Sequence, residues 1–178
     1  MIAKSDIQIL YSEQELALRV KELASQISTD YKDSKDLILI GVLKGAFVFL
    51  SDLMREISVD CQIEFIRLSS YEQGTTSSGK VKSMDLTLPD LTGKDVIIVE
   101  DIIDSGRTAK FLVDFFKTQN ARTIKLATLF DKPSRRIDEL KEIKADYTCF
   151  EIEDKFILGY GLDFEQKHRD LPYVGYIE

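Results

Sequence analysis

The segment Val96–Thr108, which reads V-I-I-V-E-D-I-I-D-S-G-R-T, constrains the fold of this chain more than any other. Four aliphatic residues, typical of a buried strand, lead into the adjacent carboxylates Glu100 and Asp101. A third carboxylate, Asp104, precedes small and polar residues, and an apolar helical pattern resumes at Ala109. We therefore expect a buried strand that stops at the acids, a glycine turn and a helix. Open parallel sheets bind their ligands at such strand ends.

The residue types in this segment suit a phosphorylated sugar. The start of the predicted helix offers free N–H groups and a positive dipole end to an anion. Gly106 lets the backbone approach a phosphate closely, and the hydroxyls of Ser105 and Thr108 add donors. The carboxylates instead suit magnesium, sugar hydroxyls or a proton. Lone acids after a strand usually form a solvated turn, but the continuation from Asp104 favours a functional site.

Hydrophobic patterns along the chain alternate between strands and helices. A helical spacing with a capping box at Ser12 and Glu15 predicts a helix over 12–27. Two further helices are predicted over 45–57 and 109–119. Strands are predicted over 37–42, 62–68, 96–99, 123–130 and 147–151. This order predicts an α/β fold with a mostly parallel sheet covered by helices on both faces.

Size and charge exclude several classes of protein. The 178 residues suffice for one α/β domain with a small appended lobe, and the net charge of -7 gives no overall attraction to nucleic acid or anionic membranes. Cys61 and Cys149 are expected to be buried, reduced thiols of a cytosolic protein. The first six residues predict no signal peptide, and the longest apolar run, near 47–50, is too short to span a bilayer.

The order of residues in Val96–Thr108 resembles the phosphoribosyl-diphosphate motif of the type I phosphoribosyltransferases. The segment D-K-F-I-L-G-Y-G-L-D (154–163) narrows the resemblance to the hypoxanthine (hypoxanthine-guanine) phosphoribosyltransferases, over about 9–176. The resemblance implies a single domain over 1–178, with a twisted, mostly parallel central sheet flanked by helices. Its core would span about 35–150, and a small hood would form from the N-terminal segment and about 151–178.

The same resemblance implies an activity: magnesium-dependent transfer of ribose 5-phosphate from 5-phosphoribosyl 1-diphosphate to N9 of hypoxanthine, and of guanine, with release of pyrophosphate. The residues implied to bind phosphoribosyl diphosphate are Glu100, Asp101, Asp104, Ser105, Gly106, Arg107 and Thr108. Those implied to bind pyrophosphate are Leu43, Lys44, Gly45 and Arg169. Those implied to bind the base are Lys132, Phe156, Ile157 and Asp163. Mg²⁺ would be held by Glu100, Asp101 and Asp163.

The resemblance also implies individual roles, each with an ordinary alternative. Asp104 would be catalytic and exchange the proton of purine N7, or it could cap a helix. Lys132 would donate to the purine O6, where the default is an exposed, solvated lysine. Phe156 would stack on the purine, where a lone phenylalanine is usually a core residue. The backbone of Ile157 would read the base edge. In these enzymes the loop at Leu43–Gly45 can hold a non-proline cis peptide.

Ser70 and Tyr71 open the polar segment 69–82, which is either a flexible surface loop or, by resemblance, a lid that excludes water from the reacting centre. His168 is the only histidine, so a histidine zinc cluster is excluded and the residue is expected to be a bystander beside Arg169. A cytoplasmic homodimer or homotetramer is expected by resemblance, with neither nucleic acid nor membrane as a partner.

One alternative has the same fold and the same phosphoribosyl-diphosphate motif. It is a pyrimidine-operon attenuator that binds RNA and retains weak uracil phosphoribosyltransferase activity. The net charge of -7 and the segment 154–163 speak against it. The sequence leaves open the preferred purine, the oligomeric state, the number of magnesium ions and the isomer of the Leu43–Lys44 peptide.

Overall fold

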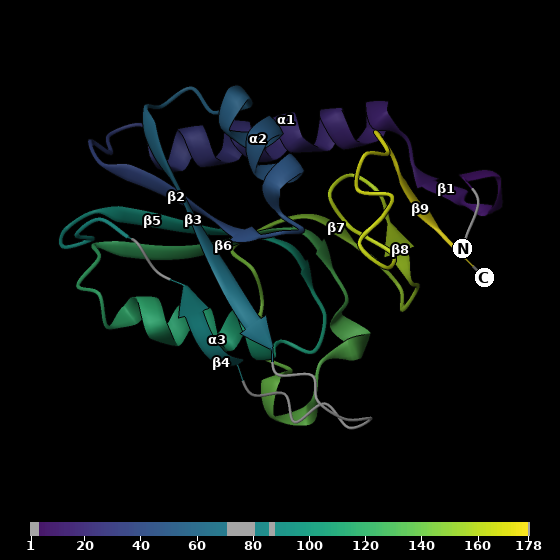
Figure 1. Cartoon of the computed structure of the whole chain (residues 1–178). Coiled ribbons are helices and arrows are strands. Elements are labelled where there is room, and N and C mark those ends of the chain that lie inside the picture. Colours follow the sequence, from purple (N-terminus) through teal and green to yellow (C-terminus); the bar gives the residue numbers. More distant parts are fainter. Residues whose placement is uncertain (1–3, 71–80, 86–87, 178) are drawn as a thin grey trace.

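The computed structural model describes residues 4–70, 81–85 and 88–177. A six-stranded sheet forms its centre, with five neighbouring strands parallel and the edge strand β4 antiparallel to β3 (Figure 1). In spatial order the strands are β4 (Val81–Asp85), β3 (Cys61–Ser70), β2 (Leu37–Leu43), β5 (Asp95–Ile103), β6 (Thr123–Asp131) and β7 (Tyr147–Glu151). The predicted α/β fold with a mostly parallel sheet is therefore confirmed.

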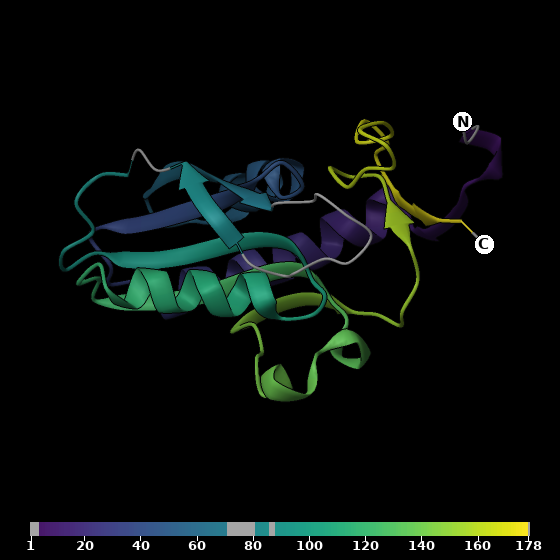
Figure 2. The same cartoon turned by 60° about the horizontal axis from the view of Figure 1, so that its bottom comes forward.

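Helices cover both faces of this sheet, because its central strands are apolar on both faces. Helices α1 (Glu13–Asp30) and α2 (Phe47–Glu56) lie on one face, and α3 (Arg107–Lys117) lies on the other (Figures 1 and 2). Alternate residues of β2 divide between the two cores, Leu37 and Leu39 on the α1–α2 side and Ile38 and Ile40 on the α3 side. Strands buried on both faces read as continuous aliphatic runs, which is why the sequence predicts them well.

A second, three-stranded antiparallel sheet joins the two terminal segments at one end of the molecule (Figure 1). Its strands, in spatial order, are β1 (Gln8–Tyr11), β9 (Val174–Tyr176) and β8 (Ile157–Leu158). This sheet and the loop 159–173 are called the hood below. Ile7, Leu158 and Leu171 form a small core of their own there. A hood built from both terminal segments agrees with the prediction.

Local signals set several boundaries correctly. The Ser12–Glu15 capping box is present, with the Ser12 N–H donating to Glu15 Oε2 at 2.8 Å and the Glu15 N–H donating to Ser12 Oγ at 3.3 Å.

The described residues also include three short 3-10 helices: η1 (Lys4–Asp6), η2 (Pro133–Arg135) and η3 (Asp138–Leu140). None of the described helices is both long and apolar enough to cross a membrane.

Three expectations need correction. Strand β5 does not stop at the acids but continues through Glu100 and Asp101, because it pairs with β6 as far as Ile103. Cys61 is only partly buried, although Cys149 is buried and both thiols are free. The predicted loop 69–82 begins in β3 and ends in β4. Its middle, 71–80, lies outside the described residues, so the proposed lid residue Tyr71 and the lid itself stay predictions.

Candidate active site

A glycine turn between β5 and α3 forms the centre of the site. Gly106 is the N-cap of α3 and has a left-handed φ of 85°, a conformation that favours glycine. It supplies no capping side chain, so N–H groups of the first helical turn are available to a ligand. A cavity of about 270 Å³ lies here, lined by Glu100, Asp101, Ile102, Ile103, Asp104, Ser105, Gly106, Thr108 and Ala109. Asp104 therefore does not cap α3, which was the ordinary alternative to a catalytic role for this residue.

The two adjacent acids on β5 lie at this cavity with little to neutralise them. Glu100 is 5% exposed, and its Oε1 has no hydrogen-bond partner among the described residues. Burial, followed by the charge of Asp101, raises the pKa of Glu100 well above its ordinary value. Burial also raises the pKa of Asp101 to about 6, although the Ile102 N–H and the charge of Arg169 oppose the shift. Such a pair accepts a proton or a cation readily.

The loop after β2 packs directly against Asp101. The peptide between Leu43 and Lys44 is cis, as in the enzymes that the sequence resembles. A Cβ on Gly45 would lie 1.4 Å from Asp101 Oδ2, so no residue with a side chain fits there. Gly45 therefore brings the predicted pyrophosphate loop into contact with the predicted ribose and magnesium site.

The hood closes over the same corner. Arg169 pairs with Asp163 at 2.6 Å and donates to the Gly161 carbonyl at 2.7 Å. A Cβ on Gly161 would lie 2.4 Å from the carbonyl oxygen of Gly45, so the two loops touch through their backbones. Lys44 Nζ also donates to the side-chain oxygen of Gln166 at 2.9 Å. The structure thus brings together both predicted pyrophosphate groups and the predicted metal ligand Asp163.

Of the predicted base-binding residues other than Asp163, Lys132 follows β6, Phe156 precedes β8 and Ile157 begins β8. Lys132 is 6% exposed rather than solvated, and its Nζ donates to the Lys155 carbonyl at 2.5 Å. Phe156 is 52% exposed rather than a core residue, and its ring meets Phe164 edge-on at 5.7 Å. Ile157 is buried in β8. An exposed aromatic ring and a buried ammonium group suit a flat, polar-edged ligand.

The Asp104 side chain is more exposed to solvent than a general base in a closed site would be. Its side chain is 46% exposed and pairs with Arg135 at 3.1 Å. Arg135 also pairs with Asp154 at 3.4 Å, and Asp154 lies 3.9 Å from Lys132 Nζ. A row of alternating charges therefore links the predicted catalytic carboxylate to the predicted O6 donor.

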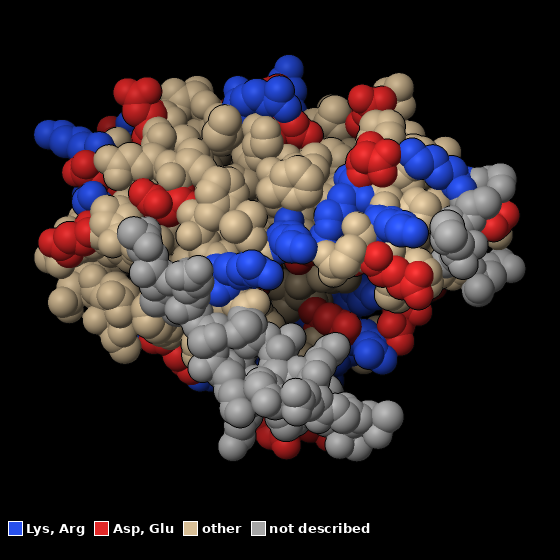
Figure 3. Space-filling model, viewed as in Figure 1, with Lys and Arg blue, Asp and Glu red and all other residues tan. Residues whose placement is uncertain are grey.

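The surface view shows the same arrangement on a larger scale. Lys and Arg side chains gather around a hollow on this face, and acidic side chains are recessed inside it (Figure 3).

Among residues 4–70, 81–85 and 88–177, no three His, Cys, Asp or Glu side chains group closely enough to hold a metal ion by themselves. Magnesium commonly takes only one or two protein carboxylates and completes its shell with phosphate and water oxygens. The unpartnered Glu100 oxygen and the neighbouring Asp101 fit that kind of site.

Comparison with known proteins decides the family. A model described as "Phosphoribosyl transferase domain" matches residues 6–165. The chain belongs to the phosphoribosyltransferase family. It is 48% identical over 176 residues to a hypoxanthine-guanine phosphoribosyltransferase of Streptococcus pyogenes serotype M3, covering 98% of this chain and 96% of the relative. The corresponding protein of Streptococcus mutans is 44% identical over 178 residues, covering 100% and 97%.

Solved structures agree with the family. A hypoxanthine phosphoribosyltransferase of Staphylococcus aureus has a TM-score of 0.87 at 36% identity and covers 98% of this chain and 93% of its own. A hypoxanthine-guanine phosphoribosyltransferase of Bacillus anthracis, solved with a HEPES molecule in its active site, has a TM-score of 0.84 at 45% identity, covering 96% and 98%. The type I phosphoribosyltransferase fold is thereby confirmed.

Three polar residues at the site, Arg135, Arg136 and Gln166, were not predicted from the sequence. Arg135 and Arg136 follow the D-K-P segment, and adjacent arginines on a surface loop carry no special signal. Gln166 lies in the hood loop with a positive φ of 64° and accepts from Lys44. Their partners lie far away in the sequence, so only the fold reveals them. His168, next to Arg169, has a positive φ of 67°.

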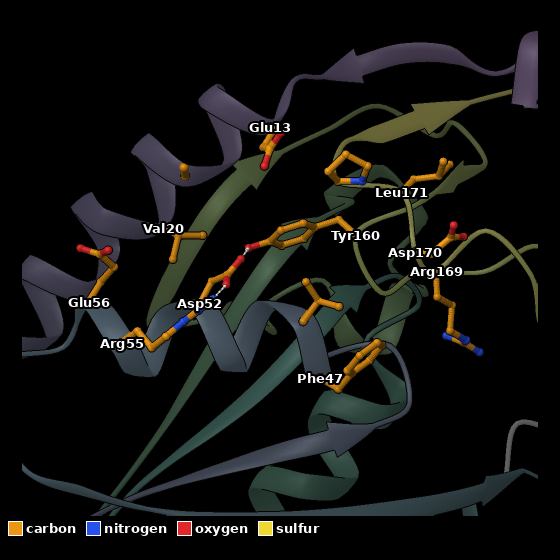
Figure 4. Close-up of a pocket in the computed structure, with 13 residues that line it drawn as sticks. Glu13, Val20, Phe47, Asp52, Arg55, Glu56, Tyr160, Arg169, Asp170 and Leu171 are labelled. Atoms are coloured by element: carbon orange, nitrogen blue, oxygen red, sulfur yellow. Dashed lines mark hydrogen bonds and ion pairs between the residues drawn. The ribbon is translucent and has the colours of Figure 1, made fainter.

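A larger cavity lies beside the predicted site, not in it. It measures about 770 Å³ and runs between α1, α2 and the hood (Figure 4). Tyr160 crosses it and donates a hydrogen bond to Asp52, shown dashed in Figure 4. Of the residues predicted to bind substrate, only Arg169 borders it. Six of the residues predicted to bind phosphoribosyl diphosphate instead line the smaller, more polar cavity: Glu100, Asp101, Asp104, Ser105, Gly106 and Thr108.

Proposed function

We propose that this chain transfers ribose 5-phosphate from phosphoribosyl diphosphate to N9 of hypoxanthine, and of guanine, releasing pyrophosphate in purine salvage. One observation carries the proposal. Gly45 packs against Asp101, on which the charge of Arg169 also acts, and Asp104 is linked through Arg135 and Asp154 to Lys132. The relatives named above as hypoxanthine-guanine phosphoribosyltransferases support the same assignment.

The phosphoribosyl group would occupy the turn before α3. Backbone N–H groups of 105–108 and the dipole of α3 suit the 5′-phosphate, with added donors from the Ser105 and Thr108 hydroxyls. Arg107 would add its charge at the first helical position. Glu100 and Asp101 are acceptors for the ribose hydroxyls. In this arrangement the start of α3 would bind the 5′-phosphate, and the acids of β5 would bind the ribose hydroxyls.

Pyrophosphate would leave toward the Gly45 loop. Gly45 packs against Asp101, and the charge of Arg169 also acts on that carboxylate, so the backbone amides of Leu43–Gly45 and the Arg169 cation would bind the leaving group together. We propose that Glu100, Asp101 and Asp163 hold Mg²⁺ together with oxygens of the substrate. When bound, magnesium would stabilise the negative charge that develops on the pyrophosphate.

The base would lie between Phe156 and the Asp104–Lys132 pair. An ammonium group has three donors, so Lys132 can keep its bond to the Lys155 carbonyl and still donate to the purine O6. Asp104 would take the proton of N7 as N9 attacks the ribose. The backbone of Ile157 would bind the opposite edge of the base. These groups favour a 6-oxopurine, because a ring lacking O6 leaves the Lys132 charge without its partner.

We also propose that the protein is a cytoplasmic homodimer or homotetramer. The two free cysteines support a reducing compartment. The oligomeric state rests on the family resemblance alone, and size-exclusion chromatography with light scattering would measure it. Membranes and nucleic acid are not proposed as partners, in keeping with the net charge of -7.

A spectrophotometric assay with phosphoribosyl diphosphate, magnesium and each of five bases tests the activity. Hypoxanthine and guanine should give nucleotide and pyrophosphate, whereas adenine and uracil should be poorer substrates. The rate with xanthine decides the preference among the 6-oxopurines, which the sequence leaves open. Filter binding to RNA separates the attenuator alternative, which the relatives and the net charge do not favour. Transfer to uracil alone, or specific RNA binding without purine transfer, would refute the proposal.

A further inference from the structure

Arg136 is a buried cation directly beneath the site. Its side chain is 2% exposed, and all three guanidinium nitrogens donate hydrogen bonds. Its acceptors are the carbonyls of Ile103 (2.8 Å), Asp104, Lys132 (3.4 Å) and Ile143 (3.2 Å) and the carboxylate of Asp131. A buried charge is stable only when it is paired in this way.

Four of these five acceptors lie where two strands of the site end. Ile103 is the last residue of β5 and Asp104 follows it, whereas Asp131 is the last residue of β6 and Lys132 follows it. The fifth, Ile143, lies between β6 and β7. The Lys132 N–H also donates to the Ile103 carbonyl at 3.0 Å, so that oxygen accepts hydrogen bonds from both Lys132 and Arg136. One planar guanidinium therefore fixes the backbone at Asp104 relative to the backbone at Lys132. A fork of donors at set angles can do this, and a single ammonium cannot.

The position of Arg136 also distinguishes it from an ordinary structural ion pair. A Cβ on Gly106 would lie 3.0 Å from Arg136 Cδ, so the side chain supports the phosphate turn from below. Arg135, its neighbour, links the side chains of Asp104 and Asp154 from outside. Both arginines contact Asp104, Arg136 at its backbone carbonyl and Arg135 at its carboxylate.

We propose that Arg136 is a positioning residue that fixes the separation of Asp104 and Lys132 and thereby sets the selectivity for 6-oxopurines. The inference rests on the proposed function, in which Asp104 meets N7 and Lys132 meets O6 of one ring. Hydrogen bonds at two atoms of a rigid base discriminate only if their donors and acceptors stay in register. A misplacement of about 1 Å at a reacting centre can lower the rate by about 10²-fold.

The test compares hypoxanthine with purine, which has N7 and lacks O6. The quantity measured is the inhibition constant of purine divided by the KM for hypoxanthine. In Arg136→Lys this ratio should fall about tenfold or more, because Lys132 no longer meets O6 correctly. The kcat/KM for hypoxanthine should fall more than that for phosphoribosyl diphosphate. A purely structural role would leave the ratio unchanged.

Two further variants keep the test decisive. Arg136→Met combined with Asp131→Leu removes both buried charges together, a change that folded proteins often tolerate. It should show the same loss of discrimination. Arg122→Met is the matched control, since it removes an arginine from the buried Asp95 at the other end of β5. It should leave the ratio unchanged even if the melting temperature falls.

The outcomes separate the two proposals. An inactive wild-type protein would refute the proposed function itself. An active wild type whose Arg136 variants keep the wild-type ratio would overturn the role of Arg136 alone. Equal losses of kcat/KM for both substrates would also overturn it, because they would assign Arg136 to the phosphate turn only. Circular dichroism of each variant verifies the fold before the ratio is interpreted.

Discussion

Strand β5 carries buried acids at both of its ends, and the two ends differ in how those acids are stabilised. At the first residue, Asp95 accepts hydrogen bonds from the hydroxyls of Ser34 and Thr123 and pairs with Arg122. Arg122 is the largest of the causes that lower the pKa of Asp95 to about 2. The charge of Asp95 is therefore compensated by neighbouring residues of the protein, without any ligand.

Toward the other end, the charge of Asp101 acts on Glu100, and the charge of Arg169 offsets only part of the effect of burial on Asp101. One Glu100 oxygen has no partner among the described residues, and burial raises the pKa of both carboxyl groups. The surrounding backbone is nevertheless tightly packed, since Gly45 admits no side chain beside Asp101. The missing neutralisation therefore reflects the local choice of residues and not loose packing.

The difference teaches how one strand divides stability and function between its ends. A satisfied acid stabilises the fold when it is ionised, whereas an unsatisfied pair destabilises it and leaves acceptors for a substrate. Active sites often retain such unfavourable groups, and the rest of the structure offsets them. The predictions below would sharpen or break this contrast.

The largest effect is expected just beyond the carboxyl end of β5. Asp104→Asn should lower kcat by about 10²–10⁴-fold, because the amide keeps the shape but cannot accept the N7 proton. Calorimetry should show nearly unchanged binding of phosphoribosyl diphosphate. Asp154→Asn is the matched control, since Asp154 pairs with the same Arg135 and should retain a kcat near that of the wild type. An unchanged kcat in Asp104→Asn would remove this residue from proton transfer.

The next effect concerns the satisfied end and affects stability alone. The lowered pKa of Asp95 corresponds to about 2 kcal/mol of folding free energy at neutral pH. This contribution is complete above the unfolded-state pKa of 3.8 and is lost as the pH falls toward about 2. Asp95→Asn should therefore lower the melting temperature by about 4–8 °C at pH 7, and by roughly half as much near pH 3.

Activity measurements complete that test. Asp95→Asn should keep the wild-type KM values for both substrates, because the network around Asp95 lies at the opposite edge of the sheet from the site. The exposed pair Lys110–Asp114 gives the control, and Asp114→Asn should change stability little. A loss of substrate affinity in Asp95→Asn would show that the two ends of β5 are coupled.

Much of this contrast is hidden in the sequence. The aliphatic half of β5 is predictable because both of its faces are buried, and the glycine turn is predictable from residue type. The continuation of the strand through Glu100 and Asp101 is not, since polar residues break the pattern and only pairing with β6 extends the strand. The role of Gly45 is equally hidden, because its contact with Asp101 arises from folding.

Long-range polar contacts account for most of the rest. Arg136 and Asp104 lie 32 residues apart, and Lys44 and Gln166 lie 122 apart. No periodicity or local motif encodes such pairs. Several site residues drawn from the family resemblance lie at or just beyond the ends of β2, β5 and β6, but Lys132 is buried, contrary to what its residue type alone suggests.

A smaller effect should appear in the pH dependence of substrate binding. Ligand-holding carboxylates must be ionised, and the pKa of Asp101 is raised to about 6. Affinity for phosphoribosyl diphosphate with magnesium should thus fall by about tenfold per unit below pH 6 and level off above it. The ligand's own ionisation is removed by comparison with Asp101→Asn, which should lose this dependence. Equal slopes in both proteins would contradict the assignment of Asp101.

The smallest effect has the opposite sign to that of Asp95→Asn. The raised pKa of Glu100 means that the folded state holds its proton more tightly than the unfolded chain does. The ionised form therefore destabilises the fold, a penalty that is absent below the ordinary glutamate pKa of 4.5 and grows as the pH rises through the raised pKa. Glu100→Gln removes the charge and should raise stability at pH 8 by about 1 kcal/mol, or about 2–4 °C.

Urea unfolding at pH 5 and pH 8 measures this gain, which should be smaller at the lower pH. The exposed Glu142 provides the control, since Glu142→Gln should leave stability nearly unchanged at both values. The stabilised Glu100→Gln variant should also bind phosphoribosyl diphosphate more weakly, because an acceptor for the ribose and magnesium is lost. If Glu100→Gln were instead as destabilising as Asp95→Asn, the acid pair would contribute to the fold, and the two ends of β5 would be alike.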